Sequence, residues 1–288
     1  MRLRAMAKIN LGLDVLRKRE DGYHEVRMIM QTIQMYDLLD IRKKEEPGIS
    51  LSTNLPYVPS DERNLVYKAA KLLMDEFDIK EGLSMKLTKF IPVAAGMAGG
   101  SSNAAAVLFG MNRLFGLRLT QQELMDRGVK LGADVPYCVM RGTVLAEGIG
   151  EELSVLPAMP KCTVLIAKPP ISVSTKMVYE ALDSKEIVEH PDIDGILEGL
   201  RKGDLHKVAD SMGNVLEDVT IPMHPVIADI KKVMQDCGAI GAMMSGSGPT
   251  VFGLFENRAS AREAQRMIRD KGLTRQAYVT NIHNVRRK

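Results

Sequence analysis

The chain has 288 residues, of which 45% are hydrophobic, so it can bury one large core or two ordinary ones. Its formal net charge is only +3, with basic and acidic residues interspersed, which argues against binding to nucleic acid or to a membrane surface. The cysteines Cys138, Cys162 and Cys237 show no metal-ligand spacing, so we expect reduced thiols in a cytoplasmic protein. No segment has the pattern of a signal peptide or a membrane span.

The first half of the chain predicts strands of one sheet with helices between them. Apolar residues two apart indicate the strands, and apolar residues three or four apart indicate the helices. The predicted strands cover residues 3–15, 26–41, 83–91 and both ends of 143–156. The predicted helices cover 61–77, 101–114 and a short segment that begins at a capping box of Thr120 and Glu123.

Pro157 and Pro160 interrupt this pattern, and we place a domain boundary there. The predicted domains are therefore residues 1–157 and 158–288. In the second domain the predicted strands are 162–167, 239–244, 251–255 and 278–283, and the predicted helices are 175–182, 192–217, 225–237 and 259–271.

The segment from Pro92 to Ala106 reads PVAAGMAGGSSNAAA and is the most informative part of the chain. Small residues precede Ser101 and an apolar helical pattern, so backbone N–H groups at a helix start could approach an oxyanion closely. The spacing fits neither a Walker A loop nor a dinucleotide-binding loop. Such a run alone is equally consistent with close packing of a helix on a strand.

Three further segments accompany this loop: AKIN at 7–10, LGADVP at 131–136 and SGSGPT at 245–250. In order and position the four segments resemble the motifs of the GHMP kinase family, over essentially the whole chain. The resemblance implies an α+β, two-domain GHMP kinase fold. Its N-terminal domain is expected to be like domain 2 of ribosomal protein S5, and its C-terminal domain ferredoxin-like.

Two more segments, DGYHEV at 21–26 and AEGIGE at 146–151, narrow the resemblance within the family. They are similar to members that phosphorylate a cytidine diphosphate-linked sugar alcohol, diphosphocytidyl methylerythritol, in non-mevalonate isoprenoid synthesis. The implied reaction transfers the γ-phosphate of ATP, with Mg2+, to the 2-hydroxyl. The implied enzyme is a cytoplasmic monomer or homodimer with no nucleic-acid or membrane partner.

Phosphoryl transfer needs in-line positioning, charge neutralisation and often a carboxylate that accepts the hydroxyl proton. By resemblance Asp134 is that general base, and Lys8 lies beside it and keeps the carboxylate ionised. Taken alone, LGADVP would favour a carboxylate that caps the segment beginning at Pro136. Lys8, in an alternating strand, would by itself be expected at the surface.

The resemblance also assigns the nucleotide site, with magnesium ligands unknown. Lys89 is expected to reach the phosphates, although a solvated lysine at a strand edge is an equally good interpretation. The remaining predicted ATP-binding residues are Pro92, Val93, Ala94, Ala95, Gly96, Met97, Ala98, Gly99, Gly100, Ser101, Ser102 and Asn103. Ala94 and Ala95 replace glycines of many relatives, so positive φ angles are less accessible there.

The alcohol substrate is assigned to other residues by the same resemblance. Tyr23 and Tyr179 are expected to stack on the cytosine, and His24 and Asn10 to supply polar contacts. Tyr23 could instead cover the core from a turn, and Tyr179 could be a core position of its helix. The other expected contacts are Thr175, Gly246, Ser247 and Gly248.

Three other functions fit parts of this pattern. A kinase for homoserine or mevalonate would keep the phosphate loop but not Tyr23, His24 and Tyr179. A non-catalytic nucleotide- or RNA-binding protein on the S5-like domain would not need Asp134 and would show steep salt dependence. A decarboxylase on the same fold is disfavoured by the turn at residues 22–24.

Overall fold

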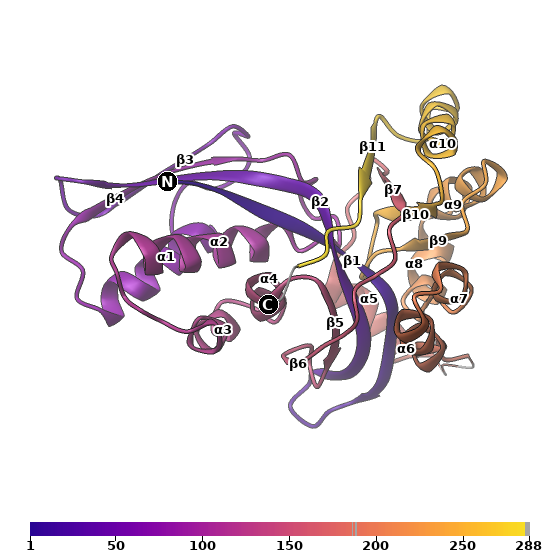
Figure 1. Ribbon diagram of the computed structural model, residues 1–288, viewed down its shortest axis with the longest axis horizontal. Coiled ribbons are helices and arrows are strands. Elements are labelled where there is room, and N and C mark those ends of the chain that lie inside the picture. Colours follow the sequence, from indigo (N-terminus) through magenta and orange to yellow (C-terminus); the bar gives the residue numbers. More distant parts are fainter. Residues whose placement is uncertain (186, 188, 286–288) are drawn as a thin grey trace. The chain divides into compact units, whose positions relative to one another are not determined.

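The computed structural model describes residues 1–185, 187 and 189–285 of the chain, which form two compact units (Figure 1). Unit 1 contains Met1–Ala7, Met35–Val93 and Ala98–Met140. Unit 2 contains Lys8–Gln34, Ala94–Met97 and the described chain from Arg141 onward. The first two strands each supply residues to both units, so the units do not test the sequence boundary at residue 157, which stays a prediction.

The larger sheet has the strand order β3-β4-β2-β1-β8, with β5 paired to β2 and β6 to β5. Its long strands are β1 (Arg2–Lys18) and β2 (His24–Lys44), where the sequence predicts extended segments. Within unit 1, β4 (Gly82–Thr88) pairs antiparallel with the second half of β2, and β3 (Ile49–Thr53) runs parallel to β4. Within unit 2, β5 (Thr143–Glu147) and β6 (Glu152–Val155) form a hairpin on the first half of β2.

Four helices belong to unit 1: α1 (Leu65–Glu76), α2 (Gly99–Leu114), α3 (Gln121–Val129) and α4 (Asp134–Met140). Helix α2 packs against α1 and α4 (Figure 1). It meets the sheet at Gly110, where a Cβ atom would lie 2.7 Å from Leu3 and 3.4 Å from Ile41. The absence of a side chain at Gly110 therefore sets the close approach of α2 to the strands that carry the N-terminal motif.

Unit 2 contains a four-stranded antiparallel sheet in the order β11-β7-β10-β9, with α9 and α10 packed against it (Figure 1). Its strands are β7 (Thr163–Lys168), β9 (Gly241–Met244), β10 (Val251–Phe255) and β11 (Gln276–Asn281). The remaining elements are α5 (Thr175–Leu182), α6 (Ile193–Lys202), α7 (Leu205–Asp210), β8 (Gly213–Asn214), α8 (Glu217–Met223), α9 (Val226–Asp236) and α10 (Arg258–Asp270).

Most predicted elements are present, and the differences have local causes. The capping box at Thr120 is confirmed, with the Glu123 amide donating to the Thr120 hydroxyl and the Glu123 carboxylate accepting from the Thr120 amide. Helix α2 begins at Gly99 rather than 101, directly after a left-handed Ala98. Strand β4 ends at Thr88 rather than 91, because side chains take over the backbone amides that follow.

Cys138, Cys162 and Cys237 are free thiols, as predicted. Burial raises the pKa of Cys162 to about 12, so this thiol stays protonated and unreactive near neutral pH. Among the described residues, none of the helices combines the length and the apolar character needed to cross a bilayer.

Candidate active site

The N-terminus of α2 lacks a side-chain cap. Ala98 occupies the N-cap position, where it accepts the first helical hydrogen bond, from the Ser102 amide. The amides of Gly99, Gly100 and Ser101 precede that bond, and no side chain of the N-cap accepts from them. In α1, by contrast, the Asn64 side chain accepts from the Val66 amide. Helix α2 therefore presents donors and the positive end of its dipole to an anion.

The phosphate loop, residues 92–98, adopts left-handed backbone conformations at two alanines. The φ angles are +50° at Ala94 and +52° at Ala98, in addition to +68° at Gly96. Positive φ angles were expected to be less accessible at Ala94 and Ala95; Ala94 adopts one nonetheless, Ala95 does not, and Ala98 adopts one as well. A left-handed non-glycine residue costs roughly 1–2 kcal/mol, so this loop carries backbone strain directly before the start of α2.

Within unit 2, Gly96 contacts the loop of residues 245–250 through its backbone. A Cβ on Gly96 would lie 2.1 Å from the Ser245 carbonyl oxygen, so only glycine fits. The Ser245 hydroxyl donates to the Gly96 carbonyl at 2.9 Å. A Cβ on Gly246 would lie 3.3 Å from the Gly96 carbonyl oxygen and 3.7 Å from the Asn10 amide oxygen. Two of the motifs read from the sequence, SGSGPT and the phosphate loop, thus meet at Gly96.

Lys8 and Asn10 are buried on β1, with 5% and 0% of their surfaces exposed. The Lys8 ammonium donates to the Asn10 amide oxygen at 2.7 Å, as expected for residues two apart on one strand face. The Lys8 amide donates to the Met97 carbonyl at 3.2 Å, next to Gly96. Strand alternation alone predicted that Lys8 would face solvent. This is wrong, because residues 5–15 of β1 are buried on both faces of the strand.

The 245–250 loop is held by residues that the sequence reasoning did not single out. The Asn214 amide group donates to the Met244 and Gly246 carbonyls, at 2.9 Å each. The Thr220 hydroxyl donates to the Ser247 carbonyl at 3.4 Å. The Ser247 hydroxyl shares a 2.8 Å hydrogen bond with Thr175 at the first turn of α5. The predicted substrate residues Thr175 and Ser247 are thus direct neighbours.

A second group of predicted substrate residues lies at the other end of α5. The His24 and Tyr179 rings have centroids 4.7 Å apart and are tilted by 41°. Asp183, directly after α5, accepts from Lys18 and is 2.6 Å from the His24 Nε2. These contacts, that with His24 foremost, lower the pKa of Asp183. Tyr23 is 59% exposed, so its ring is available to a ligand rather than covering the core.

Lys89 is buried in unit 1, with 8% of its surface exposed, rather than solvated at a strand edge. Its ammonium donates to the Asp37 carboxylate and, at 3.0 Å, to the Asn103 amide oxygen. A Cβ on Gly99 would lie 3.2 Å from this ammonium, which therefore lies beside the first residue of α2. The predicted contact of Lys89 with ATP phosphates stays a prediction. The ammonium lies near the start of α2, paired with Asp37.

Asp134 is the first residue of α4, and its side chain is half-buried. A carboxylate in the first turn is favoured by the helix dipole, and Pro136 is tolerated there because its missing N–H would have no intrahelical partner. Helix α4 packs against α2 and α3 within unit 1. Asp134 is thus fixed on a rigid element rather than on a free loop, which suits a group that must accept a proton at a defined place.

Residues expected to bind the triphosphate differ in how free their side chains are. Pro92 and Ser101 are half-buried and Val93 is 39% exposed, whereas the Ser102 hydroxyl donates to the Met6 carbonyl at 2.6 Å. The Ser102 and Asn103 side chains are therefore engaged within the protein. The Ser102 amide already donates to the Ala98 carbonyl, so backbone contacts to a phosphate would come from Gly99, Gly100 and Ser101.

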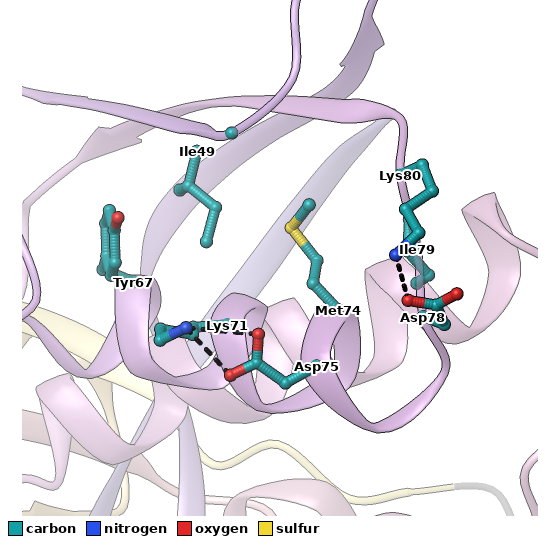
Figure 2. A pocket seen from close by; sticks show the side chains of 9 residues that line it. Ile49, Tyr67, Lys71, Met74, Asp75, Asp78, Ile79 and Lys80 are labelled. Atoms are coloured by element: carbon teal, nitrogen blue, oxygen red, sulfur yellow. Dashed lines mark hydrogen bonds and ion pairs between the residues drawn. The ribbon is translucent and has the colours of Figure 1, made fainter.

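A hollow of about 400 Å³ lies in unit 1 (Figure 2). It is lined by Gly48, Ile49, Tyr67, Lys71, Met74, Asp75, Asp78, Ile79 and Lys80. Its charged residues pair with one another, Lys71 with Asp75 at 2.9 Å and Lys80 with Asp78. The hollow contains none of the residues that the sequence motifs assign to catalysis or binding.

Two family models match the chain. Residues 64–142 match the GHMP kinases N terminal domain, which includes the phosphate loop, α2 and Asp134. Residues 196–273 match GHMP kinases C terminal, which includes the 245–250 loop. The order of the two matches along the chain agrees with the order of the sequence motifs that they contain.

Individual proteins extend this similarity to nearly full length. A 4-diphosphocytidyl-2-C-methyl-D-erythritol kinase of Lachnospira eligens is 58% identical over 280 residues, which is 97% of each chain. A crystal structure of 4-(cytidine 5'-diphospho)-2C-methyl-D-erythritol kinase superposes with a TM-score of 0.84 at 32% identity, covering 99% of this chain and 100% of that one. A crystal structure of homoserine kinase from Cytophaga hutchinsonii superposes with a TM-score of 0.76 at 21% identity, covering 96% of this chain and 94% of that one. At this identity the similarity is one of fold.

Proposed function

The chain belongs to the GHMP kinase family, and we propose that it transfers the γ-phosphate of ATP to the 2-hydroxyl of 4-diphosphocytidyl-2-C-methyl-D-erythritol. The products would be ADP and the 2-phosphate, with the diphosphate link to cytidine left intact. The name of the 58% identical relative supports the substrate. The start of α2 and the residues Lys8 and Asp134, taken up below, support phosphoryl transfer.

The observation that carries the phosphoryl-transfer part is the uncapped start of α2. The amides of Gly99, Gly100 and Ser101 and the helix dipole form a ready site for phosphate oxygens. The Lys89 ammonium, whose charge is balanced by the Asp37 carboxylate, lies beside Gly99, where the proposal has it approach the phosphates. Charge neutralisation by preorganised donors is the main requirement of phosphoryl transfer, because little covalent chemistry is left to the protein.

In this proposal Asp134 accepts the proton of the 2-hydroxyl as that oxygen attacks the γ-phosphorus. Lys8 stabilises the negative charge that develops on the transferring group. Asn10 accepts a hydrogen bond from Lys8 at 2.7 Å and so orients the ammonium. The burial of Lys8 strengthens its electrostatic effect, since water screens it less.

The cytidine part of the substrate would bind where Tyr23, His24 and Tyr179 lie. The exposed Tyr23 ring and the Tyr179 ring provide stacking surfaces, and base stacking on an aromatic side chain contributes about 1–3 kcal/mol. Gly246, Ser247, Gly248 and Thr175, which lie together in unit 2, would contact the diphosphate and the alcohol. Homoserine and mevalonate have no group that would use the aromatic residues.

Mg2+ is the metal ion we propose to accompany ATP. The described residues contain no group of three or more His, Cys, Asp or Glu side chains arranged to hold a metal. A magnesium ion bound mainly through phosphate oxygens and water, with few protein ligands, is consistent with that finding. When bound, it would neutralise phosphate charge. A cytoplasmic location and a monomeric or homodimeric state stay part of the proposal.

The test is release of ADP by the purified protein with ATP and Mg2+. Diphosphocytidyl methylerythritol, homoserine and mevalonate are compared in parallel at equal concentrations. Turnover restricted to the cytidyl compound would support the proposal. Turnover with homoserine or mevalonate instead would keep the family and overturn the substrate.

A further inference from the structure

A buried cluster of polar side chains lies directly before the phosphate loop. It consists of Asp37 at the middle of β2, Lys89 and Asn103, and we call it the Asp37 cluster. Their exposed fractions are 0%, 8% and 2%. The reaction proposed above assigns no role to Asp37, and sequence reasoning did not single it out.

The Asp37 carboxylate is fully used within unit 1. Its Oδ1 accepts from the Phe90 amide at 2.7 Å and from the Ile91 amide at 2.8 Å. Its Oδ2 accepts from the Lys89 ammonium and, at 2.8 Å, from the Asn103 amide group. One carboxylate thus connects β2, the two residues that precede the phosphate loop, and the first turns of α2.

Asn54 reinforces the same segment from the other side. Its side chain accepts from the Lys89 amide at 2.7 Å and donates to the Lys89 carbonyl at 3.2 Å. Residues 89–91 are therefore fixed by side chains although they lie outside any strand. Beyond them the chain enters the strained turns at Ala94, Gly96 and Ala98.

Stability alone is a poor reason for this arrangement. A buried ion pair must be desolvated, and apolar residues of similar volume often serve a fold as well or better. A carboxylate that accepts two consecutive backbone amides does something an apolar side chain does not do, since it sets the path of the backbone.

We propose that Asp37 is a positioning residue for nucleotide binding: by holding the Phe90 and Ile91 amides and the Lys89 ammonium, it fixes where the phosphate loop begins. It would act through the loop and through Lys89, without touching the substrates. This inference rests on the proposed binding of ATP at the start of α2.

The test compares Asp37→Ala with Asp40→Ala. Asp40 lies three residues further along β2 and forms an exposed ion pair with Arg2, at 2.8 Å. Three quantities are measured for each variant: the Kd for ATP and ADP by titration, the KM for each substrate, and thermal unfolding. In Asp37→Ala we expect the Kd for ATP to rise at least tenfold while the KM for the alcohol changes less than twofold. Asp40→Ala should change neither.

A folded Asp37→Ala protein with the ATP affinity of the wild type would overturn the proposal. So would an equal rise in both KM values, since that is the result of a general loss of structure.

The double variant Asp37→Asn, Lys89→Met separates backbone positioning from charge and decides the matter if Asp37→Ala does not fold. The side-chain oxygen of the introduced asparagine can still accept from the Phe90 and Ile91 amides. Its NH2 group can donate to the Asn103 amide oxygen, which in the wild-type protein accepts from the Lys89 ammonium. The reference is Lys89→Met alone, which lacks the same ammonium, and we expect the Kd of the double variant for ATP to stay within threefold of that reference. A loss of tenfold or more would contradict positioning through the backbone.

These titrations contain no alcohol, so they are independent of the substrate assignment. If the predicted ATP affinities are found and the cytidyl compound is not turned over, only the substrate part of the proposed function fails.

Discussion

The hydroxyl of Ser245 donates a 2.9 Å hydrogen bond to the carbonyl oxygen of Gly96. Gly96 has a φ of +68° and no room for a side chain on this side. The contact joins the phosphate loop to the loop that carries the predicted substrate residues Gly246, Ser247 and Gly248. A hydrogen bond to a single glycine thus links the predicted phosphate loop to the predicted substrate loop.

Gly96→Ala should weaken catalysis more than it weakens the fold. Its Cβ would lie 2.1 Å from the Ser245 carbonyl oxygen, so one of the two backbone segments must move. We expect the KM for ATP to rise at least tenfold in steady-state kinetics. The matched control is Gly116→Ala, at φ +64° with no atom within 4 Å of the added Cβ, which should cost roughly 1–2 kcal/mol of stability and leave the kinetics unchanged. Kinetic parameters that match between the two variants would contradict the role of the contact.

Ala98→Gly should stabilise the protein. Ala98 holds a φ of +52°, which glycine adopts without strain, so we expect a gain of roughly 0.5–1 kcal/mol in the free energy of unfolding. Ala104→Gly, in the buried interior of α2, should instead lose about 1–2 kcal/mol through helix propensity and a lost methyl group. Urea titrations of both variants measure the difference. A loss at Ala98 as large as that at Ala104 would show that the loop is not strained there.

Tyr179→Leu should impair use of the cytidyl substrate selectively. Removal of a stacking ring worth about 1–3 kcal/mol raises the KM for that substrate roughly tenfold or more, while the Kd for ATP stays within twofold. Inhibition by CDP should weaken in parallel. Tyr278→Leu, on β11, replaces an exposed tyrosine outside the proposed pocket and should change neither quantity. An unchanged KM in Tyr179→Leu would remove this residue from the proposed pocket.

Asp183 should make a pH-dependent contribution to stability. Its pKa is lowered in the folded protein, by His24 first and Lys18 next, so the folded state favours the ionised carboxylate. The stabilisation is thus complete above the unfolded pKa of about 3.9 and is lost as pH falls through the folded pKa. Urea midpoints of wild type and Asp183→Asn at pH 7, 5, 4 and 3.5 should differ most at pH 7 and converge at the acidic end. A difference between the two urea midpoints that grows toward low pH would contradict this prediction.

Asp134→Asn should abolish turnover and spare nucleotide binding. Loss of a general base costs about 10²- to 10⁴-fold in kcat, whereas the amide keeps the size of the side chain at the start of α4. The Kd for ATP should stay within twofold. Asp126→Asn, an exposed position on α3, serves as the control and should keep full activity. Retention of most of kcat in Asp134→Asn would refute the base assignment.

Sequence patterns predicted features whose causes are local. The capping box at Thr120 needs only residues three apart, and helix α5 begins and ends at the residues predicted, Thr175 and Leu182. The free cysteines and the GHMP kinase fold were also predicted correctly. The assignments of individual site residues stay predictions, although the structure brings Lys8 beside Asn10 and Thr175 beside Ser247.

Features that depend on distant contacts escaped the sequence reasoning. Asp37 contacts residues 52 and 66 positions away, and nothing in its sequence neighbourhood distinguishes it from the half-buried Asp40. Asn214 holds a loop some 30 residues further along the chain. Alternation on β1 could not tell which face of the strand meets solvent, because both are buried. A search for charged residues within otherwise apolar strands would have indicated both Asp37 and Asp40 without separating them.

The most direct measurement is ³¹P NMR of the product formed from ATP and 4-diphosphocytidyl-2-C-methyl-D-erythritol. We predict one new phosphomonoester signal, assigned to the 2-position through its coupling to carbon, with the two diphosphate signals retained. A monoester at another hydroxyl, a cleaved diphosphate, or no product while homoserine or mevalonate is phosphorylated would contradict the account.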